Sequence, residues 1–311
     1  MHIVLLCATN RGFRFAETLF DIGQGHRFTV FSFQETPWEP RYFAEIKRLV
    51  LERGHEFNEA RNVAQSKWGS FWANDAVDLV FIVSWRYMVP ACVLQRARLG
   101  AYVFHDSLLP KYRGFAPTLW AIRNGEKELG VTLFQAAEDF DAGDIVDQRP
   151  VAIGACDSVA DVMKRVTGTY LDIVRDNFSS LLSGNFATRP QNHEEATYTC
   201  KWTPEDGLID WNDTSQAVFD LIRATSRPYP GAFTYLNNRK LTVWSAELPA
   251  SPRQYVSSAP GRVVEIRHDV GSLVLTGEGC ILLKAVQFEG KPVMNASEAL
   301  NSLSQTLGKR Y

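Results

Sequence analysis

Apolar and amphipathic stretches alternate along the first third of the chain. Short apolar runs predict buried strands at residues 2–8, 28–33, 78–84 and 100–104. Apolar positions at helical spacing predict helices near residues 13–22, 40–53, 68–75 and 90–97. Strands and helices that alternate in this order are typical of an α/β fold. We therefore expect a Rossmann-like, mostly parallel sheet with helices on both faces.

The second half of the chain follows a different pattern. Residues 158–184 carry apolar positions at helical spacing from Ser158, a good helix cap, to Gly184, which predicts one long helix. A polar, irregular stretch follows this helix. We therefore divide the chain into three parts, an N-terminal domain at residues 1–190, a linker at 191–204 and a C-terminal domain at 205–311.

The C-terminal domain is expected to be rich in strands. After a predicted helix at 214–226, Asn237-Asn238 separates two strand-like segments, which indicates a hairpin. Further short strands are expected at residues 261–267, 271–276 and 280–287. Short strands at this spacing are typical of a small barrel, so we expect an OB-like domain.

Composition excludes several classes of protein. The 311 residues are 45% hydrophobic and 22% charged, as in ordinary globular proteins. The formal net charge of −2 argues against a main role in binding polyphosphate. The five cysteines form no CxxC pair, and no apolar run is long enough for a membrane span. We expect a cytoplasmic protein without a metal or a membrane contact.

Candidate chemistry begins where the predicted strand at 100–104 ends. His105 opens a loop rich in Pro and Gly, and ligands of open α/β sheets bind beyond the carboxyl ends of the strands. A histidine packed beneath a loop is the alternative interpretation. The turn at residues 8–12 lacks the spaced glycines of a dinucleotide-binding loop, which disfavours an NAD enzyme.

A second polar cluster spans residues 138–144. It contains four acids, Glu138, Asp139, Asp141 and Asp144. By itself this cluster indicates a solvated turn, because Asp-Ala-Gly is a good turn sequence and the ligand spacing of an EF-hand is missing.

Together the two segments match a family pattern. The run HxSLLPxYRG…P…W…NGE…GVTL…DxGDI, from His105 to Ile145, resembles the 10-formyltetrahydrofolate-dependent formyltransferases. Segments of the second half, such as Ile209-Asp-Trp and Pro230-Gly-Ala-Phe, resemble the C-terminal half of methionyl-tRNA formyltransferase. They resemble more closely the nucleotide-sugar N-formyltransferases, such as the domain that acts on UDP-linked amino-arabinose. The resemblance covers essentially the whole chain.

The resemblance implies the catalytic residues. His105 matches the family histidine and Asp141 the family aspartate, while Val103 stands where the family has an asparagine. Three explanations for Val103 remain open. Another donor, such as Ser107 or a backbone N–H, replaces the asparagine; the chain uses a modified chemistry; or it is a weak or inactive relative, for example a protein that binds folate or hydrolyses formyl-folate.

The resemblance also implies where the ligands bind. The co-substrate is 10-formyltetrahydrofolate, and the predicted folate-binding residues follow the third predicted strand and fill the acidic loop: Trp85, Arg86, Tyr87, Met88, Glu138, Asp139 and Asp141. An aromatic-rich strand end suits a flat pterin ring. Core packing is the alternative for Trp85 and Tyr87.

Charge decides between acceptor classes. Residues 205–311 contain eleven Lys or Arg and eleven Asp or Glu, whereas a tRNA-binding surface needs clustered positive charge. We therefore expect a small amine, most simply an amino sugar carried on a nucleotide, bound by Arg113, Lys201 and Trp202. Initiator tRNA is the alternative acceptor. The sequence does not reveal the sugar or the oligomeric state.

Overall fold

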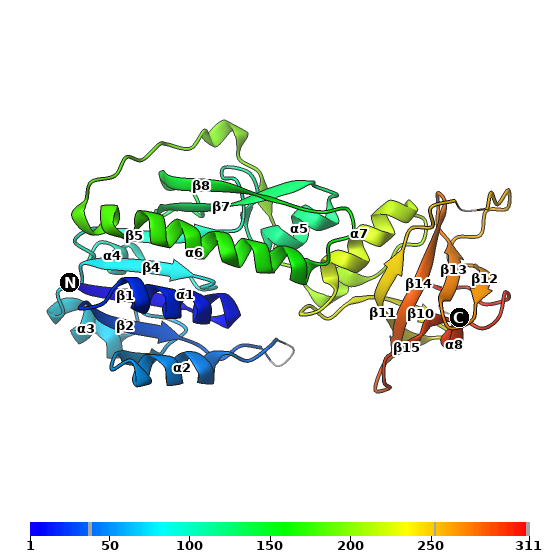
Figure 1. Cartoon of the computed structure of the whole chain (residues 1–311), viewed down its shortest axis with the longest axis horizontal. Coiled ribbons are helices and arrows are strands. Elements are labelled where there is room, and N and C mark those ends of the chain that lie inside the picture. Colours follow the sequence, from blue (N-terminus) through cyan, green and yellow to red (C-terminus); the bar gives the residue numbers. More distant parts are fainter. Residues whose placement is uncertain (37–38, 252, 309–311) are drawn as a thin grey trace. The chain divides into compact units, whose positions relative to one another are not determined.

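The predicted strands of the first half form one seven-stranded sheet in a computed structural model, which describes residues 1–36, 39–251 and 253–308 (Figure 1). The strand order is β3-β2-β1-β4-β5-β7-β8. The bounds are His2–Cys7 (β1), Arg27–Ser32 (β2), Glu56–Glu59 (β3), Leu79–Val83 (β4), Ala101–His105 (β5), Glu128–Gln135 (β7) and Ile145–Ala152 (β8). The strands from β3 to β5 pair in parallel, and β7 and β8 pair antiparallel. The predicted mostly parallel sheet is confirmed.

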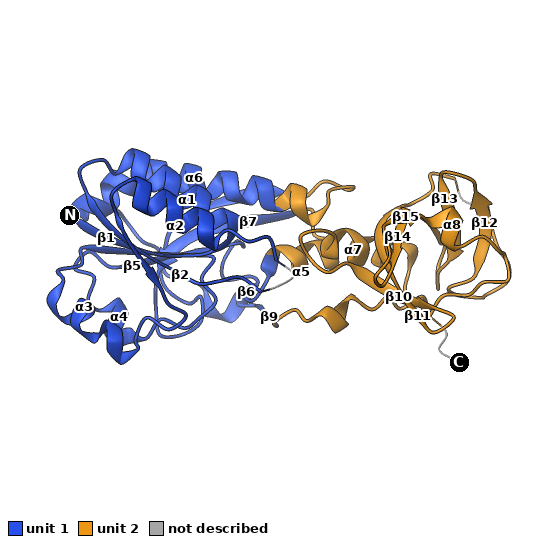
Figure 2. Cartoon of the chain, turned by 90° about the horizontal axis from the view of Figure 1, so that it is seen from below, with its two compact units in different colours: residues 1–117, 128–152, 163–200 blue, residues 118–127, 153–162, 201–311 orange. Residues whose placement is uncertain are grey.

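Helices cover both faces of this sheet (Figure 2). One face carries α1 (Thr9–Ile22), α2 (Phe43–Glu52) and α6 (Val159–Ser183), and the other carries the shorter α3 (Gly69–Asn74) and α4 (Ala91–Leu94). On the first face, Phe15 of α1 packs edge-on against Phe81 and Phe104 of the sheet. Because the core is largely aromatic here, α1 and α6 are held close to β5.

The alternation along β5 positions the residues of interest. Phe104 points toward α1 and α6, where it contacts Phe15 and Tyr170. Side chains of a strand alternate between the two faces, so Val103 and His105 point to the opposite face. There Val103 packs between two apolar clusters.

Several elements differ from the sequence-based expectation. The edge strand β3 was not expected, because its sequence EFNE contains one apolar residue. The helix expected near 90–97 is the four-residue α4, and the one near 68–75 is a 3-10 turn (Ser66–Trp68) followed by α3. The long helix predicted at 158–184 is confirmed as α6. Its apolar positions continue at helical spacing, and Ser158 and Gly184 mark the two ends of the helix correctly.

Residues after 200 form a separate antiparallel sheet. Its strands run in the order β10-β11-β14-β13-β12, with β15 paired to β14. The bounds are Ala232–Leu236 (β10), Arg239–Glu247 (β11), Val263–Arg267 (β12), Gly271–Leu275 (β13), Cys280–Phe288 (β14) and Met294–Asn295 (β15), with helices α7 at Ser215–Thr225 and α8 at Ala296–Ala299. A β-rich second half is confirmed, and the OB-like assignment stays a prediction.

The chain divides into two units (Figure 2). Unit 1 comprises residues 1–117, 128–152 and 163–200, and unit 2 comprises residues 118–127, 153–162 and 201–311. Two short segments of the N-terminal half therefore belong to unit 2, including most of α5 (Pro117–Arg123). A two-stranded ladder of β6 (Arg113–Gly114) and β9 (Tyr198–Thr199) belongs to unit 1. In the described part of the chain, no helix is both long and apolar enough to cross a membrane.

Candidate functional site

His105 ends β5 and is almost fully buried. Its Nε2 lies 2.8 Å from the carbonyl oxygen of Tyr112. Its Nδ1 lies 3.6 Å from Oδ2 of Asp141. A carbonyl oxygen only accepts hydrogen bonds, so Nε2 carries the proton that forms the first contact. The basic nitrogen of the neutral ring is then Nδ1, which faces the carboxylate.

Asp141 lies in the loop between β7 and β8. Its backbone has a φ of 50°. Oδ2 accepts a hydrogen bond of 2.8 Å from the Gly114 N–H, so the carboxylate is held from the side of the β6 ladder. Gln191 donates to the carbonyls of Asp141 and Gly143, at 2.9 and 2.7 Å. A Cβ at Gly143 would lie 1.7 Å from the Gln135 carbonyl, so only glycine lets the loop close here.

The pair suits proton transfer at Nδ1. The distance of 3.6 Å between Nδ1 and Oδ2 is longer than an ordinary N–H···O hydrogen bond. A carboxylate at this place orients the ring and stabilises the imidazolium that forms when Nδ1 takes up a proton. The arrangement therefore provides a base whose second nitrogen is fixed by Tyr112.

Neither the side chain of Val103 nor that of Ser107 presents an available hydrogen-bond donor to a reacting oxygen. Val103 is half-buried and packs on Leu109, Phe134 and Ile145. Ser107 is buried, and its Oγ donates to the Lys111 carbonyl at 2.6 Å. A role for Ser107 as the replacement donor requires that this bond break, so that role stays a prediction.

Arg113 is held inside the protein. It is 2% exposed and donates through Nε and Nη2 to Gln191, with further contacts to Tyr198 and His193. These bonds tie the segment around residue 191 to the acidic loop through Gln191. The position favours a structural role, and the predicted contact of Arg113 with substrate stays a prediction.

An aromatic cluster follows β4. The rings of Trp85 and Tyr87 meet the ring of Phe33 edge-on, at 5.2 and 5.0 Å between centroids. Among the described residues, Trp85 Nε1 is one of the few buried polar atoms without a hydrogen-bond partner. Arg86 forms a two-pronged ion pair with Glu39, and Met88 is exposed. The strand end therefore offers aromatic surface and a donor that the protein itself leaves unused.

The remaining predicted site residues lie on the acidic loop and in unit 2. Glu138 and Asp139 are exposed on the acidic loop beside Phe140, whose ring contacts that of Phe115. Lys201 and Trp202 belong to unit 2, where the ring of Trp202 meets that of Trp120 at 5.3 Å. The residues brought together in unit 1 are thus His105, Asp141 and the loops that hold them.

Comparison with known proteins identifies the family of this chain. The family model for formyl transferase matches residues 20–171, and the model for the formyl transferase C-terminal domain matches residues 201–304. The two models together cover most of the chain. The chain belongs to the formyl transferase family. It is therefore a transferase, and the expected family is confirmed.

Solved structures share the fold of this formyltransferase at low identity. WlaRD, a sugar 3N-formyl transferase solved with dTDP and 5-N-formyl-THF, matches with a TM-score of 0.67 and 16% identity over 94% of this chain and 99% of that one. The N-formyltransferase from Helicobacter canadensis, in complex with folinic acid and dTDP-3-aminofucose, matches with a TM-score of 0.63 and 16% identity. The match covers 91% of this chain and 98% of that one. HypX from Aquifex aeolicus with tetrahydrofolic acid matches with a TM-score of 0.63 and 20% identity over 96% of this chain. The formyltransferase spans 46% of that HypX chain.

The candidate site includes residues that sequence reasoning missed. Tyr112 and Gly114 act through backbone groups, which no side-chain pattern reveals. Gln191 holds both the acidic loop and Arg113 from a stretch interpreted as a linker. Thr132, opposite His105 on β7, accepts from Leu109 N–H and donates to the Ser107 carbonyl, so it fixes the loop after β5. The polar residues inside the apolar strand β7 were the one available signal.

Left-handed backbone gathers around His105. Among the described residues of unit 1, positive φ at residues other than glycine occurs at Thr9, Ser84, Tyr112, Ala116 and Asp141. Thr9 and Ser84 follow β1 and β4, and Tyr112 and Ala116 lie in the loop after β5. Residues held in this conformation cost about 1–3 kcal/mol each and cluster at functional sites.

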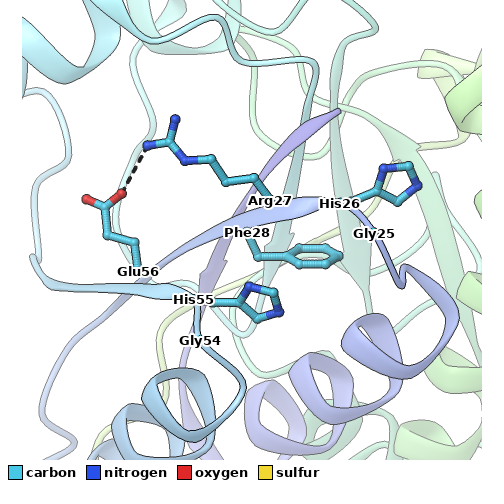
Figure 3. A pocket seen from close by; sticks show the side chains of 7 residues that line it. All are labelled: Gly25, His26, Arg27, Phe28, Gly54, His55 and Glu56. Carbon is cyan, nitrogen blue, oxygen red and sulfur yellow. Dashed lines mark hydrogen bonds and ion pairs between the residues drawn. The ribbon is translucent and has the colours of Figure 1, made fainter.

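A cavity of about 520 Å³ lies at the other edge of the sheet (Figure 3). It is lined by residues that precede or begin β2 and β3: Gly25, His26, Arg27, Phe28, Gly54, His55 and Glu56. Ligands of open α/β sheets bind at the carboxyl ends of the strands, so this cavity is not the candidate active site of the formyltransferase.

Proposed function

We propose that this formyltransferase moves a formyl group from 10-formyltetrahydrofolate to the amine of a nucleotide-linked amino sugar. The observation that carries the proposal is the His105–Asp141 pair, with Nδ1 and Oδ2 3.6 Å apart at the end of β5. Formyl transfer to an amine needs a base at the nitrogen, because only a neutral amine attacks the formyl carbon. His105 Nδ1 is such a base.

The reaction balances on this pair. The amine nitrogen attacks the formyl carbon, and its proton passes to Nδ1 of His105 while Asp141 stabilises the imidazolium. The tetrahedral intermediate then collapses as the bond between carbon and N10 of the folate breaks. The imidazolium returns its proton to N10, which yields tetrahydrofolate and the formamide. Tyr112 keeps the ring in place throughout by accepting from Nε2.

The aromatic cluster after β4 fits a pterin. Trp85 and Tyr87 supply apolar faces, and Nε1 of Trp85 supplies a donor that has no partner among the described residues. A ligand with ring nitrogens and a carbonyl satisfies such a donor, whose burial without a partner is costly. Ser84 and Trp85 follow β4, the strand paired with β5, so the cluster is next to His105 along the sheet edge. Three of the similar solved structures, those of WlaRD, HypX and the Helicobacter canadensis enzyme, contain a folate.

The acceptor is a small molecule because the charge does not suit RNA. The balanced charge of residues 205–311 offers no excess of positive residues for a tRNA backbone. WlaRD and the Helicobacter canadensis enzyme, which share the fold, were solved with dTDP or a dTDP-amino sugar. Lys201 and Trp202 are proposed contacts for the nucleotide. Methionyl-tRNA is the competing acceptor in the test below.

Val103 favours a second candidate function, transfer of the formyl group to water. Its side chain has no donor for the oxyanion, and loss of one such donor costs about a hundred- to a thousandfold in rate. His105 and Asp141 are retained, and in this second candidate His105 activates water in place of an amine.

One experiment separates these functions. The protein is incubated with 10-formyltetrahydrofolate and a panel of nucleotide-linked amino sugars, and the products are followed by mass spectrometry. A formylated sugar is expected, and the Asp141→Ala variant is the control that loses it. Formylation of charged initiator tRNA without any sugar product would replace the proposal, and formate release without a formylated acceptor would support the second candidate.

A further inference from the structure

Three polar side chains are buried together behind the strand that ends at His105. Asp106 directly follows His105, and its Oδ1 lies 2.7 Å from Nη1 of Arg11, at the start of α1. The same oxygen accepts a short hydrogen bond from the hydroxyl of Tyr170 on α6. Both the arginine and the carboxylate are nearly buried, at 10% and 13% side-chain exposure. Asp106 thus ties the end of β5 to two helices.

Aromatic packing fixes this cluster in place. The ring of Tyr170 stacks on Phe104 at 4.9 Å, and the Arg11 guanidinium lies 4.7 Å from the centre of the Tyr170 ring. Phe104 is the residue before His105 on the other face of β5. Burial, and then the charge of Asp106, raise the pKa of Tyr170, so its hydroxyl keeps the proton that it donates.

Stability alone does not explain a buried ion pair at this position. Removing two charges from water costs several kcal/mol per ion, and apolar residues of similar volume are often as stabilising. What the pair provides is a fixed place for one residue. Asp106 is joined to His105 by a peptide bond and also begins the loop that returns the Tyr112 carbonyl to Nε2 of His105. Its side chain therefore constrains the ring of His105 from two directions.

We propose that Arg11, Asp106 and Tyr170 form a positioning cluster that sets the distance between His105 Nδ1 and Asp141 Oδ2 from the face of the sheet opposite to the site. The kinetic part of this inference rests on the proposed function. The three residues touch no reacting atom and act through the backbone of residues 104–106. A shift of about 1 Å in a catalytic group lowers rates by about a hundredfold, so loosening this anchor slows the chemical step.

Two variants test the cluster in the full chain. Tyr170→Phe removes one hydroxyl and keeps the ring, and Asp106→Asn removes the charge. We expect kcat for formyl transfer to fall about tenfold in the first variant and up to about a hundredfold in the second, with unchanged KM for folate and amine. The matched control is Tyr102→Phe, which removes the hydroxyl of another buried tyrosine on the same face of β5, bound to the Leu99 carbonyl.

A second measurement does not depend on activity. The ring nitrogens of His105 are followed by ¹⁵N NMR, with His105→Ala used for assignment. We expect Asp106→Asn and Tyr170→Phe to change the Nε2–H and Nδ1 signals of His105 and Tyr102→Phe to leave them unchanged. Unchanged His105 signals, or a wild-type kcat in both variants, would overturn the positioning role. Absence of any formylated product from the wild type would reject the proposed function, while the NMR comparison would still decide the inference.

Discussion

The unit 1 sheet has an amino edge, where its parallel strands begin, and a carboxyl edge, where they end and where His105 lies. The two edges use similar residue types in opposite ways. At the amino edge, Arg27 pairs with Glu56 while both are about half exposed, and the turns with positive φ contain glycine at positions 25, 54 and 100. Around His105, the ion pair of Arg11 and Asp106 is buried, and residues with side chains, such as Tyr112 and Asp141, adopt positive φ as well as Gly114. Turns that only reverse the chain use glycine, whereas the edge with strained non-glycine residues also holds the candidate base.

Histidines sharpen this comparison. Burial lowers the pKa of His55 and His26 at the amino edge, with smaller effects from the Arg53 and N-terminal charges, so their neutral forms are favoured. They contact aromatic rings and line a cavity (Figure 3). His26 and His55 are partly buried, whereas His105 is nearly buried and faces a carboxylate and a carbonyl. The histidines beside aromatic rings have a structural role here, and the histidine beside hydrogen-bond acceptors is the proposed proton carrier.

The largest expected effect separates the two edges directly. His105→Ala is expected to lower kcat/KM for formyl transfer by about a hundred- to ten-thousandfold, because the base is lost. His55→Ala is expected to leave the rate of the folded enzyme unchanged. Steady-state kinetics on both variants measures this difference. A similar loss in both variants would remove the distinction between the edges.

Gln191 tests whether the acidic loop needs its clamp. Gln191→Ala leaves Arg113 buried without its main acceptor, so we expect a loss of about 1–3 kcal/mol in the free energy of unfolding. We also expect a several-fold lower kcat, because the loop carrying Asp141 loses two hydrogen bonds. Urea unfolding and kinetics measure the two effects. The exposed Thr188, changed to Ala, is the control, and an equal effect there would contradict the clamp.

Trp85 tests the folate slot. Trp85→Phe keeps an aromatic ring and removes the Nε1–H donor. One hydrogen bond contributes about 0.5–1.5 kcal/mol, so the Kd for tetrahydrofolate is expected to rise by about two- to tenfold. Calorimetric titration with tetrahydrofolate measures it. The same change at Trp72, whose Nε1 donates to the Val63 carbonyl, is the control and should leave the folate Kd unchanged.

The amino edge is expected to control how stability depends on pH. The pKa of His55 is lowered by burial and by Arg53, so the unfolded chain binds more protons than the folded one as pH falls below about 6.5. The free energy of unfolding therefore decreases toward acid pH. His55→Phe keeps the ring contacts and removes the titrating group, which is expected to weaken that decrease. Urea unfolding over a pH series checks it, and parallel curves for the two proteins would refute it.

The smallest effect is expected at Val103. Val103→Asn restores the family donor beside His105, so activity is expected to stay unchanged or to rise. Val103 is half-buried among apolar residues, and the polar amide costs some stability. Rates and thermal unfolding are measured together. A collapse of kcat in a folded protein would show that more than a donor differs here.

The sequence predicted those elements whose pattern is local. The strands β1, β2, β4 and β5 are apolar runs bounded by polar residues, and each was placed within about two residues. The sequence of β8 is strand-like only at residues 145–146, because its polar stretch Asp-Gln-Arg-Pro does not look like a strand. Pro150 is accommodated there because β8 is an edge strand. The antiparallel pairing of β7 could not be predicted from the sequence, because an apolar run does not indicate in which direction its strand runs.

The candidate site was predictable only at residues whose side chains belong to a recognisable sequence motif. His105 and Asp141 came from the family resemblance, and the structure places them 3.6 Å apart. The contact between Arg113 and Gln191 joins residues far apart in the sequence, and nothing local marks either as a partner. Arg11, Asp106 and Tyr170 meet from three elements. Such long-range polar contacts follow from the packing of helices on the sheet.

The left-handed residues around His105 have a consequence for how this protein can change over time. Glycine at Ala116 or Ser84 would relieve local strain, since glycine adopts positive φ without penalty. The same replacement would give the surrounding loops more freedom. Mutations that make the fold more robust at this edge therefore loosen the chemistry, whereas the amino edge is open to stabilising change without that conflict. Thermostable descendants of this chain should accumulate their substitutions around the cavity at His55 and spare the loops at His105.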